Sequence, residues 1–176
     1  LNWKEKNITI TQTTSFPETN TTSLSIKTAK PQTFPLYIRD PWYAKNGVTI
    51  EVNGKKTTAI KNSNGYYVVN RSWKNNDVVI ISVNMQLYTE SMPDNKNRIA
   101  VMYGPVLLAG DLGTTMPDLV YGTPVLLTNE RDINNWIKRV ANKPLTFKMT
   151  GAGKPFDPEL SPFYSMHHKF YSVYWD

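Results

Sequence analysis

Cysteine is absent from the 176 residues of this chain. Its absence excludes disulfide bonds, a thiolate nucleophile and any zinc site built on cysteine ligands. It leaves the cellular compartment open, because exported proteins also occur without cysteine. A chain of this length buries about two-thirds of its unfolded surface, so we expect it to fold without covalent cross-links.

Concentrated positive charge and long apolar runs are absent as well. The 20 Lys and Arg against 14 Asp and Glu give a formal net charge of +6, but only Lys55-Lys56 and Lys138-Arg139 are adjacent basic pairs. Nucleic-acid binding usually requires a basic face, so no nucleic-acid partner is expected. No apolar stretch approaches the roughly 18 residues of a membrane span, so no span is expected either.

Histidine is scarce, and the two that are present are neighbours, His167 and His168. Side chains of neighbouring residues point to opposite faces of an extended strand, so the pair is not expected to bind one metal ion. We expect one histidine to be buried and hydrogen-bonded and the other to face solvent. No metal site is predicted.

No residues have the arrangement of a catalytic site. Glycosidases use two carboxylates that face each other across roughly 5–9.5 Å, and Asp157 and Glu159 would share one face if that segment were extended. The prolines around them favour a loop cap or turn instead. Asp111 and Asp118 lie in similar loop contexts, so we predict no catalytic residue in this chain.

Short alternations of apolar and polar residues are abundant, and they indicate half-buried strands. Examples are residues 8–10, 24–26, 36–38 and 48–52. The Asn53-Gly54 pair tolerates positive φ and predicts a tight hairpin turn. About eight or more short strands against one helix predict a mainly β fold, an antiparallel β-sandwich or a jelly roll.

Two later segments carry more specific predictions. Residues 67–73 and 79–85 alternate, and we predict that they form adjacent antiparallel strands. Residues 99–109 are apolar on both faces and include Gly104-Pro105. Because proline cannot donate to a strand ladder, we expect a central strand with a bulge or a sheet crossover at that point.

One short helix is predicted near residues 130–140, because apolar residues recur there at helical spacing, namely Ile133, Trp136, Ile137 and Val140. A final aromatic strand is expected from Phe163 to Trp175. The change of composition after Gly113 predicts two domains. The first, residues 1–112, is a β-sandwich, and the second, residues 113–176, has the helix and two or three strands packed on a sheet.

Aromatic residues make up 12% of the chain and are suited either to stacking on sugar rings or to core and interface packing. Trp42 and Tyr43 follow Pro41 in an expected loop, so they are the best candidates for binding a ligand. Contacts with another domain or a partner are expected from four residues near the C-terminus: Tyr164, His167, Tyr171 and Trp175.

Four segments, taken in order, resemble the β-sandwich that follows the catalytic barrel in glycoside hydrolase family 127, a group that includes β-L-arabinofuranosidases. They are residues 1–17, 35–55, 65–85 and 98–110. Residues 144–175 resemble the uncharacterised C-terminal extension of many bacterial members. The stretch from Ile38 to Ala44 departs from the family, whose members read closer to Arg-Ile-Pro-Gly-Trp-Ala.

The resemblance implies catalysis in an N-terminal (α/α)6 helical barrel, by a Cys nucleophile in a zinc cluster of Cys and Glu, with a Glu acid/base. None of these positions can be carried over to this chain. The sequence enters strand pattern directly at Leu1, without Met, so we expect a fragment of a longer protein. Zinc and enzymatic activity are expected only in the parent's catalytic domain, and the location is expected to be periplasmic or secreted.

Three functions are open at this point. The leading hypothesis is a non-catalytic accessory module that packs on and supports its own N-terminal helical catalytic domain. The second is a carbohydrate-binding module that uses exposed aromatic residues. The third is a protein-interaction or dimerisation module, because an aromatic edge strand can pair with a second copy.

Overall fold

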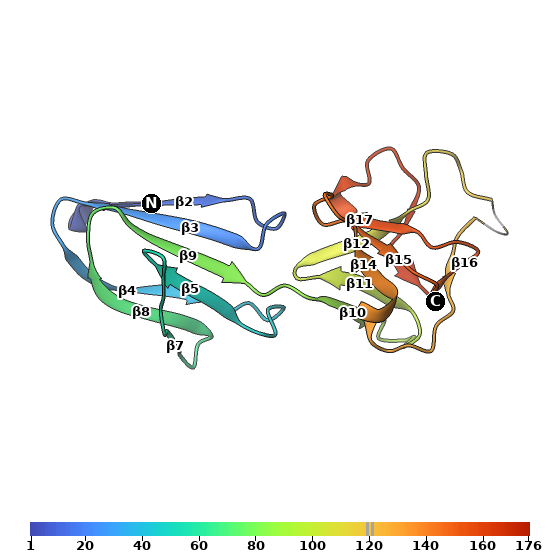
Figure 1. Cartoon of the computed structure of the whole chain (residues 1–176), viewed down its shortest axis with the longest axis horizontal. Helices are drawn as coiled ribbons and strands as arrows, with labels where there is room; N and C mark the ends of the chain where they lie inside the picture. Colours follow the sequence, from blue (N-terminus) through green and yellow to red (C-terminus); the bar gives the residue numbers. More distant parts are fainter. Residues whose placement is uncertain (119, 121) are drawn as a thin grey trace. The chain divides into compact units, whose positions relative to one another are not determined.

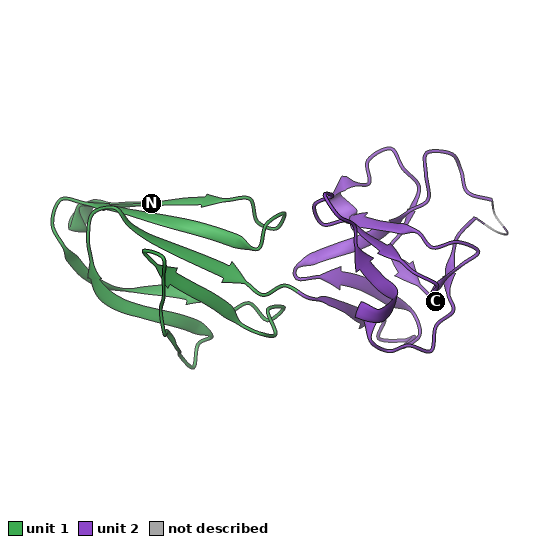
Figure 2. Cartoon of the chain, viewed as in Figure 1, with its two compact units in different colours: residues 1–85 green, residues 86–176 purple. Residues whose placement is uncertain are grey.

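The chain forms two compact units, Leu1–Met85 (unit 1) and Gln86–Asp176 (unit 2), which Figure 2 shows in different colours. The structure is a computed structural model that describes residues 1–118, 120 and 122–176. All strand pairs within these residues are antiparallel. The predicted mainly β, antiparallel fold with one short helix near residues 130–140 is confirmed.

Unit 1 is a sandwich of two sheets (Figure 1), with strand orders β1-β2-β3-β9-β5-β6 and β4-β8-β7. The larger sheet contains β1 (Asn2–Trp3), β2 (Ile8–Thr14), β3 (Thr21–Thr28), β5 (Val48–Val52), β6 (Lys55–Lys56) and β9 (Asp77–Val83). The smaller sheet contains β4 (Gln32–Arg39), β7 (Ile60–Lys61) and β8 (Tyr66–Trp73), and a 3-10 turn, η1 (Lys4–Lys6), follows β1. The jelly-roll alternative stays a prediction.

Apolar residues from both sheets share the core of unit 1. Trp73 is fully buried at 0% exposure, its ring lies 5.8 Å from that of Phe34, and its indole Nε1 donates to the Phe34 carbonyl at 2.9 Å. Alternation places every second residue of a strand on this inner face. The other buried members are Ile8, Ile26, Ile38, Ile50, Val52, Val69, Val79 and Ile81.

The hairpin predicted at Asn53-Gly54 is present. Val52 pairs with Lys55 across the turn, and both turn residues have positive φ, 53° for Asn53 and 74° for Gly54. The Asn53 side chain donates to Asp77 Oδ1 at 2.8 Å and accepts from the Val78 N–H at 2.9 Å. The turn is therefore tied to the start of β9.

The prediction that residues 67–73 and 79–85 form adjacent strands is wrong. β8 pairs with β4 and β7, whereas β9 pairs with β3 and β5 in the other sheet. The connection between them crosses from one sheet to the other, and Asp77 Oδ2 closes it by accepting from the Lys74 N–H at 2.8 Å. Both strands alternate because each has one face in the shared core.

Unit 2 is built on one larger sheet with the main order β10-β11-β12-β17-β15-β14 (Figure 1). Its strands are β10 (Leu87–Ser91), β11 (Ile99–Tyr103), β12 (Val106–Asp111), β14 (Ile137–Arg139), β15 (Phe147–Met149) and β17 (Glu159–Pro162), with β18 (Tyr171–Ser172) on β12 and β19 (Tyr174–Trp175) on β11. A separate pair joins β13 (Val125–Leu126) to β16 (Gly153–Lys154). The remaining elements are α1 (Ile133–Trp136) and the 3-10 turn η2 (Phe163–Ser165).

The C-terminal segment was predicted to form a single strand from Phe163 to Trp175. It forms two short strands instead, β18 on β12 and β19 on β11. Trp175 is 1% exposed and lies against Gly110, where an added Cβ would come within 2.4 Å of the indole ring. Arg98 binds both carboxylate oxygens of Asp176 at 2.8 Å. Only a glycine at position 110 of β12 leaves room for this ring.

The bulge or crossover predicted at Gly104-Pro105 is a hairpin turn. Tyr103 pairs with Val106, so the two residues between them connect β11 to β12, and Gly104 adopts a φ of 55°. Proline fits this place because a turn residue needs no ladder donor.

The helix ends earlier than its apolar spacing indicated, at Trp136. Asp132 caps it by accepting from the Asn134 N–H at 2.9 Å. Ile137 then pairs with Met149 as the first residue of β14. Both side chains are buried, so the strand gains the core contacts that a longer helix would have provided.

The division of the chain falls after Met85, not after residue 112 as the change of composition suggested. β11 and β12 pair with β17, β18 and β19 near the C-terminus. Their apolar faces fill the core of unit 2 together with Trp136, Phe147 and Leu160. The boundary between the units is set by hydrogen bonding between segments far apart in the sequence. Amino-acid composition along the chain does not predict such pairing.

Candidate functional site

The loop after β4 displays Trp42 at the surface of unit 1. The Trp42 side chain is 69% exposed, and its ring meets that of the half-buried Tyr43 edge to face, 5.8 Å between centroids and 79° between planes. An exposed tryptophan held in a defined orientation can provide a flat apolar surface for a ligand. These are the two residues predicted from the sequence to bind a ligand.

Hydrogen bonds and one buried residue fix this loop at both ends. The Asp40 N–H donates to the Gly65 carbonyl at 2.9 Å, and the Asp40 carboxylate forms an ion pair with Lys61. Ala44 is only 4% exposed, and its N–H donates to the Pro41 carbonyl at 2.9 Å. The aromatic pair is therefore presented by an anchored loop.

A groove of about 450 Å³ adjoins the loop, a volume within the range of small-molecule sites. Leu24 and Ile81 of the larger sheet line one wall, and the edge strand β4 lines the other. Aromatic and polar side chains complete the lining, among them Gln12, Phe16, Thr22, Tyr37, Arg39 and Tyr43. Tyr43 thus belongs both to the loop and to the groove.

Two polar side chains of the groove are held in place by neighbours. Gln12 Nε2 donates to Thr22 Oγ1 at 3.0 Å. The Arg39 guanidinium lies 5.7 Å from the centre of the Tyr66 ring and donates to the Tyr66 hydroxyl at 3.4 Å. Burial raises the pKa of Tyr43 above its usual value, so its phenol stays protonated at neutral pH.

Arg39 is the only charged residue among those that line the groove in the described part of the chain. The ion pairs found among residues 1–118, 120 and 122–176 do not include Arg39. Sequence reasoning missed both Arg39 and Gln12 as groove residues. For Arg39, the available signal was Pro35. Proline inside a strand indicates an edge strand, and Arg39 is the last residue of the same strand, β4.

Two further hollows lie around β7 and β8 in unit 1. One, of about 620 Å³, is lined by residues such as Thr57, Ile60 and Arg71, and the other, of about 370 Å³, by residues such as Val48, Lys56 and Tyr67. Tyr67 is the one aromatic residue that lines either of them in the described part of the chain. The groove beside Trp42 is therefore the better candidate for a ligand site.

The carboxylates weighed in the sequence as acid/base candidates have structural contacts. Asp157 accepts from the N–H groups of Gly151 at 2.7 Å, Ala152 at 3.1 Å and Gly153 at 2.7 Å, which confirms its predicted role as a loop cap. Glu159 forms an ion pair with Lys143 at 2.9 Å.

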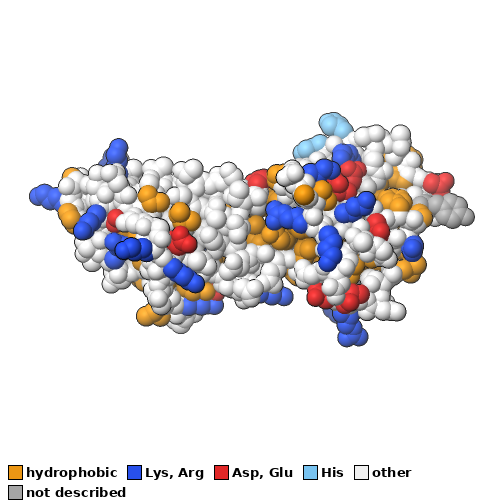
Figure 3. All heavy atoms as spheres, in the orientation of Figure 1, with side chains coloured by type: hydrophobic (Ala, Val, Ile, Leu, Met, Phe, Trp, Pro, Cys, Tyr) orange, Lys and Arg blue, Asp and Glu red, His pale blue; other side chains and the backbone are white. Residues whose placement is uncertain are grey.

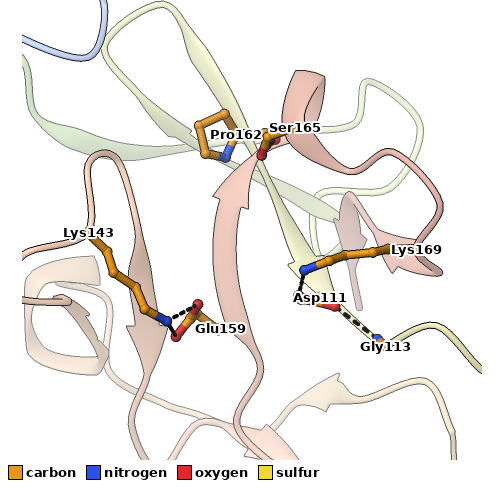
Figure 4. A network of polar contacts seen from close by, with 7 residues as sticks. All are labelled: Asp111, Gly113, Lys143, Glu159, Pro162, Ser165 and Lys169. Carbon is orange, nitrogen blue, oxygen red and sulfur yellow. Dashed lines mark hydrogen bonds and ion pairs between the residues drawn. The ribbon is translucent and has the colours of Figure 1, made fainter.

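Figure 4 shows this Glu159 pair and a second one in unit 2, between Asp111 and Lys169. Asp111 also accepts from the Gly113 N–H at 2.9 Å. Desolvation acts to raise the pKa of Asp111, but hydrogen bonds from Lys169 and Gly113 outweigh it and hold the pKa below its usual value. The Asp111 pair joins β12 to the C-terminal segment, and the Glu159 pair joins β17 to the segment before β15, so both have structural contacts.

The two histidines do not lie on a strand. His167 and His168 occupy a turn after η2, both are exposed, and His168 has a φ of 59°. Figure 3 shows histidine side chains at the surface of unit 2. The expectation that one of them is buried is wrong, because the segment turns here instead of continuing as a strand.

No group of three or more metal-ligating side chains occurs among residues 1–118, 120 and 122–176. The zinc cluster that the resemblance implies requires Cys ligands, and this sequence contains none. The residues present therefore do not fit that cluster.

The four residues expected to contact another domain or a partner have different surroundings. Tyr164 and Tyr171 are 49% and 42% exposed, and His167 is exposed too. Trp175 is buried in the core of unit 2, so its surface is not available to a partner. Lys and Arg side chains, blue in Figure 3, are spread over the visible face of each unit, with Asp and Glu side chains, in red, among them. Within the described residues, no helix is long and apolar enough to span a membrane.

The chain is thus a mainly β module of two units, with a groove of about 450 Å³ in the first. Residues 1–85 match the family described as the middle domain of β-L-arabinofuranosidases of the GH127 type. Residues 118–176 match a domain of unknown function, DUF4986. Unit 1 therefore matches the GH127 middle domain over residues 1–85, and the resemblance noted in the sequence is confirmed. A search of curated proteins found no match.

Solved glycoside hydrolases have similar folds. A GH127 β-L-arabinofuranosidase from Geobacillus stearothermophilus T6 is 17% identical, with a TM-score of 0.68, and covers 100% of this chain and 31% of its own length. Another GH127 β-arabinofuranosidase is 20% identical, with a TM-score of 0.68 and coverage of 99% and 32%. A protein named only as a glycoside hydrolase gives 18% identity, a TM-score of 0.65 and coverage of 99% and 33%. The chain thus spans about a third of the length of these structures.

Proposed function

We propose that this chain is the non-catalytic accessory part of a glycoside hydrolase, and that it packs on and supports an N-terminal (α/α)6 catalytic barrel of the same protein. The observation that carries the proposal is the match of unit 1 to a GH127 middle domain. The coverage of only about a third of the similar structures is in keeping with a further catalytic domain.

The surroundings of the carboxylates support the non-catalytic role. Retaining and inverting glycosidases need one carboxyl group with a raised pKa as the acid. Asp111 and Asp157 instead have pKa values below their usual range, each because hydrogen-bond donors outweigh the effect of burial. Groups held in the ionised form are poor proton donors at neutral pH.

Two experiments test this proposal. Reading the coding sequence upstream of Leu1 is expected to reveal a helical barrel with the Cys and Glu residues of a zinc cluster, and a gene without one would overturn the accessory role. The 176-residue chain is expected to hydrolyse an aryl β-L-arabinofuranoside no faster than buffer. Hydrolysis above buffer by the purified chain, lost on mutation of one of its own carboxylates, would contradict the proposal.

A periplasmic or secreted location is proposed for the parent.

A further inference from the structure

The groove beside Trp42 combines three features that together describe a ligand. It has aromatic rings, a fixed amide and a cation, but no carboxylate lines it in the described part of the chain. Sugar rings have one apolar face of C–H groups and a rim of hydroxyls, which suit a flat aromatic surface and nearby hydrogen-bonding groups. We propose that this groove binds a glycan segment that carries uronic acid carboxylates.

The aromatic pair supplies the stacking surface. The Trp42 side chain is too exposed, at 69%, to contribute much to the core, yet its loop is anchored through Asp40 and Ala44. The Tyr43 ring lies 5.8 Å from that of Trp42 and also lines the groove, so a sugar stacked on Trp42 lies next to a groove residue. A surface ordered in advance loses little conformational freedom when a ligand binds.

Arg39 supplies the preference for an acidic sugar. Its guanidinium has five N–H donors, and among the described residues only one bond, to the Tyr66 hydroxyl, uses them. The Tyr66 ring supports the guanidinium at 5.7 Å. Since no ion pair in the described residues neutralises Arg39, a uronate carboxylate can accept from it in a charge-assisted hydrogen bond.

Polar groups of the groove walls supply the remaining contacts. The Gln12 amide is oriented by Thr22 at 3.0 Å and leaves its carbonyl oxygen for a sugar hydroxyl. β4 is the edge strand of its sheet, so part of its backbone is not paired with another strand. Pro35 makes this edge unsuited to adding a peptide strand, and this favours a glycan over a peptide as the occupant.

The test is calorimetric titration of the 176-residue chain with trigalacturonic acid and, as a neutral comparator, arabinotriose. Trigalacturonic acid is expected to bind at least about tenfold more tightly than arabinotriose, and its binding to weaken with added salt. Trp42→Ala and Arg39→Gln are each expected to weaken it by about tenfold or more. Both side chains are exposed, so circular dichroism should show unchanged folding.

Matched variants in unit 2 control for general effects. Tyr174→Ala removes an aromatic ring that is 49% exposed, and Arg131→Gln removes an exposed positive charge, so neither should change binding. The proposal is overturned if trigalacturonic acid does not bind, if arabinotriose binds as tightly, or if binding persists in both groove variants. This proposal does not depend on the accessory role. If the chain binds no glycan, it can still lack hydrolase activity and still follow a catalytic barrel, so the failure of one proposal is distinguishable from the failure of the other.

Discussion

Asp157 illustrates how the backbone can use a carboxylate that sequence spacing alone leaves available for acid/base chemistry. Three consecutive N–H groups, from Gly151, Ala152 and Gly153, converge on it at 2.7–3.1 Å. Burial acts to raise its pKa, but these donors outweigh that effect and hold the pKa below its usual value. The residue stabilises the loop before β16.

This lowered pKa predicts a loss of stability in acid. A carboxyl group with a lowered folded-state pKa stabilises fully above its unfolded pKa, about 3.9, and loses that contribution as the pH falls through the folded value. Asp157→Asn is expected to cost about 1–3 kcal/mol at pH 7 and less near pH 2, because the unfolded-state carboxyl is protonated there and the advantage of the folded carboxylate shrinks. Urea unfolding at both pH values measures the difference.

The exposed Asp94 provides a control. Asp94→Asn is expected to change the free energy of unfolding by less than about 0.5 kcal/mol at either pH. If Asp157→Asn lowers the free energy of unfolding equally at both pH values, the charge of the native carboxylate contributes nothing to stability.

At the scale of elements, the β5–β6 hairpin depends on the backbone conformation of its turn. Gly54 has a φ of 74°, and an added Cβ would have no atom within 4 Å. Gly54→Ala therefore tests strain without a clash, and it is expected to destabilise unit 1 by about 1–2 kcal/mol. Gly54→Asn should cost less than Gly54→Ala, since Asn tolerates the left-handed region.

The midpoint of urea unfolding measures both hairpin variants. If alanine and asparagine cost the same, the left-handed conformation of Gly54 is not what determines the stability of the turn. If alanine costs nothing, the hairpin adopts another turn in solution.

Other elements show where local patterns lose their predictive power. The alternation of residues 67–73 and 79–85 located both strands, since alternate residues such as Val69 and Trp73 in β8 and Val79 and Ile81 in β9 are buried in the core. It could not tell whether the second strand returns in the same sheet or in the facing one, because both routes bury the same residues. Similarly, Ile137 fits either a helix or a strand, and pairing with Met149 decides the outcome.

At the scale of the whole molecule, each unit has a core of its own. Trp73 is a central residue of the unit 1 core and Trp175 of the unit 2 core. Trp73→Ala is expected to destabilise unit 1 by about 3–5 kcal/mol and to leave amide protection in unit 2 unchanged. Hydrogen exchange followed by mass spectrometry reports both units in one experiment.

Trp175→Ala is the matched reverse variant, because it removes the same side chain from the other core. It is expected to lower protection in residues 86–176 while residues 1–85 keep theirs. Loss of protection across the whole chain in either variant would mean that the two units unfold together.

The sequence by itself determined the fold class, the Asn53-Gly54 hairpin, the cap at Asp157 and the relationship to the GH127 family. These features rest on local pattern, on turn residues and on the order of segments, all of which act over short stretches of chain. Only the tertiary structure decided the unit boundary after Met85, the burial of Trp175 and the groove that contains Arg39. Each of these depends on contacts between segments far apart in the sequence, and such pairings leave no signal in a local pattern.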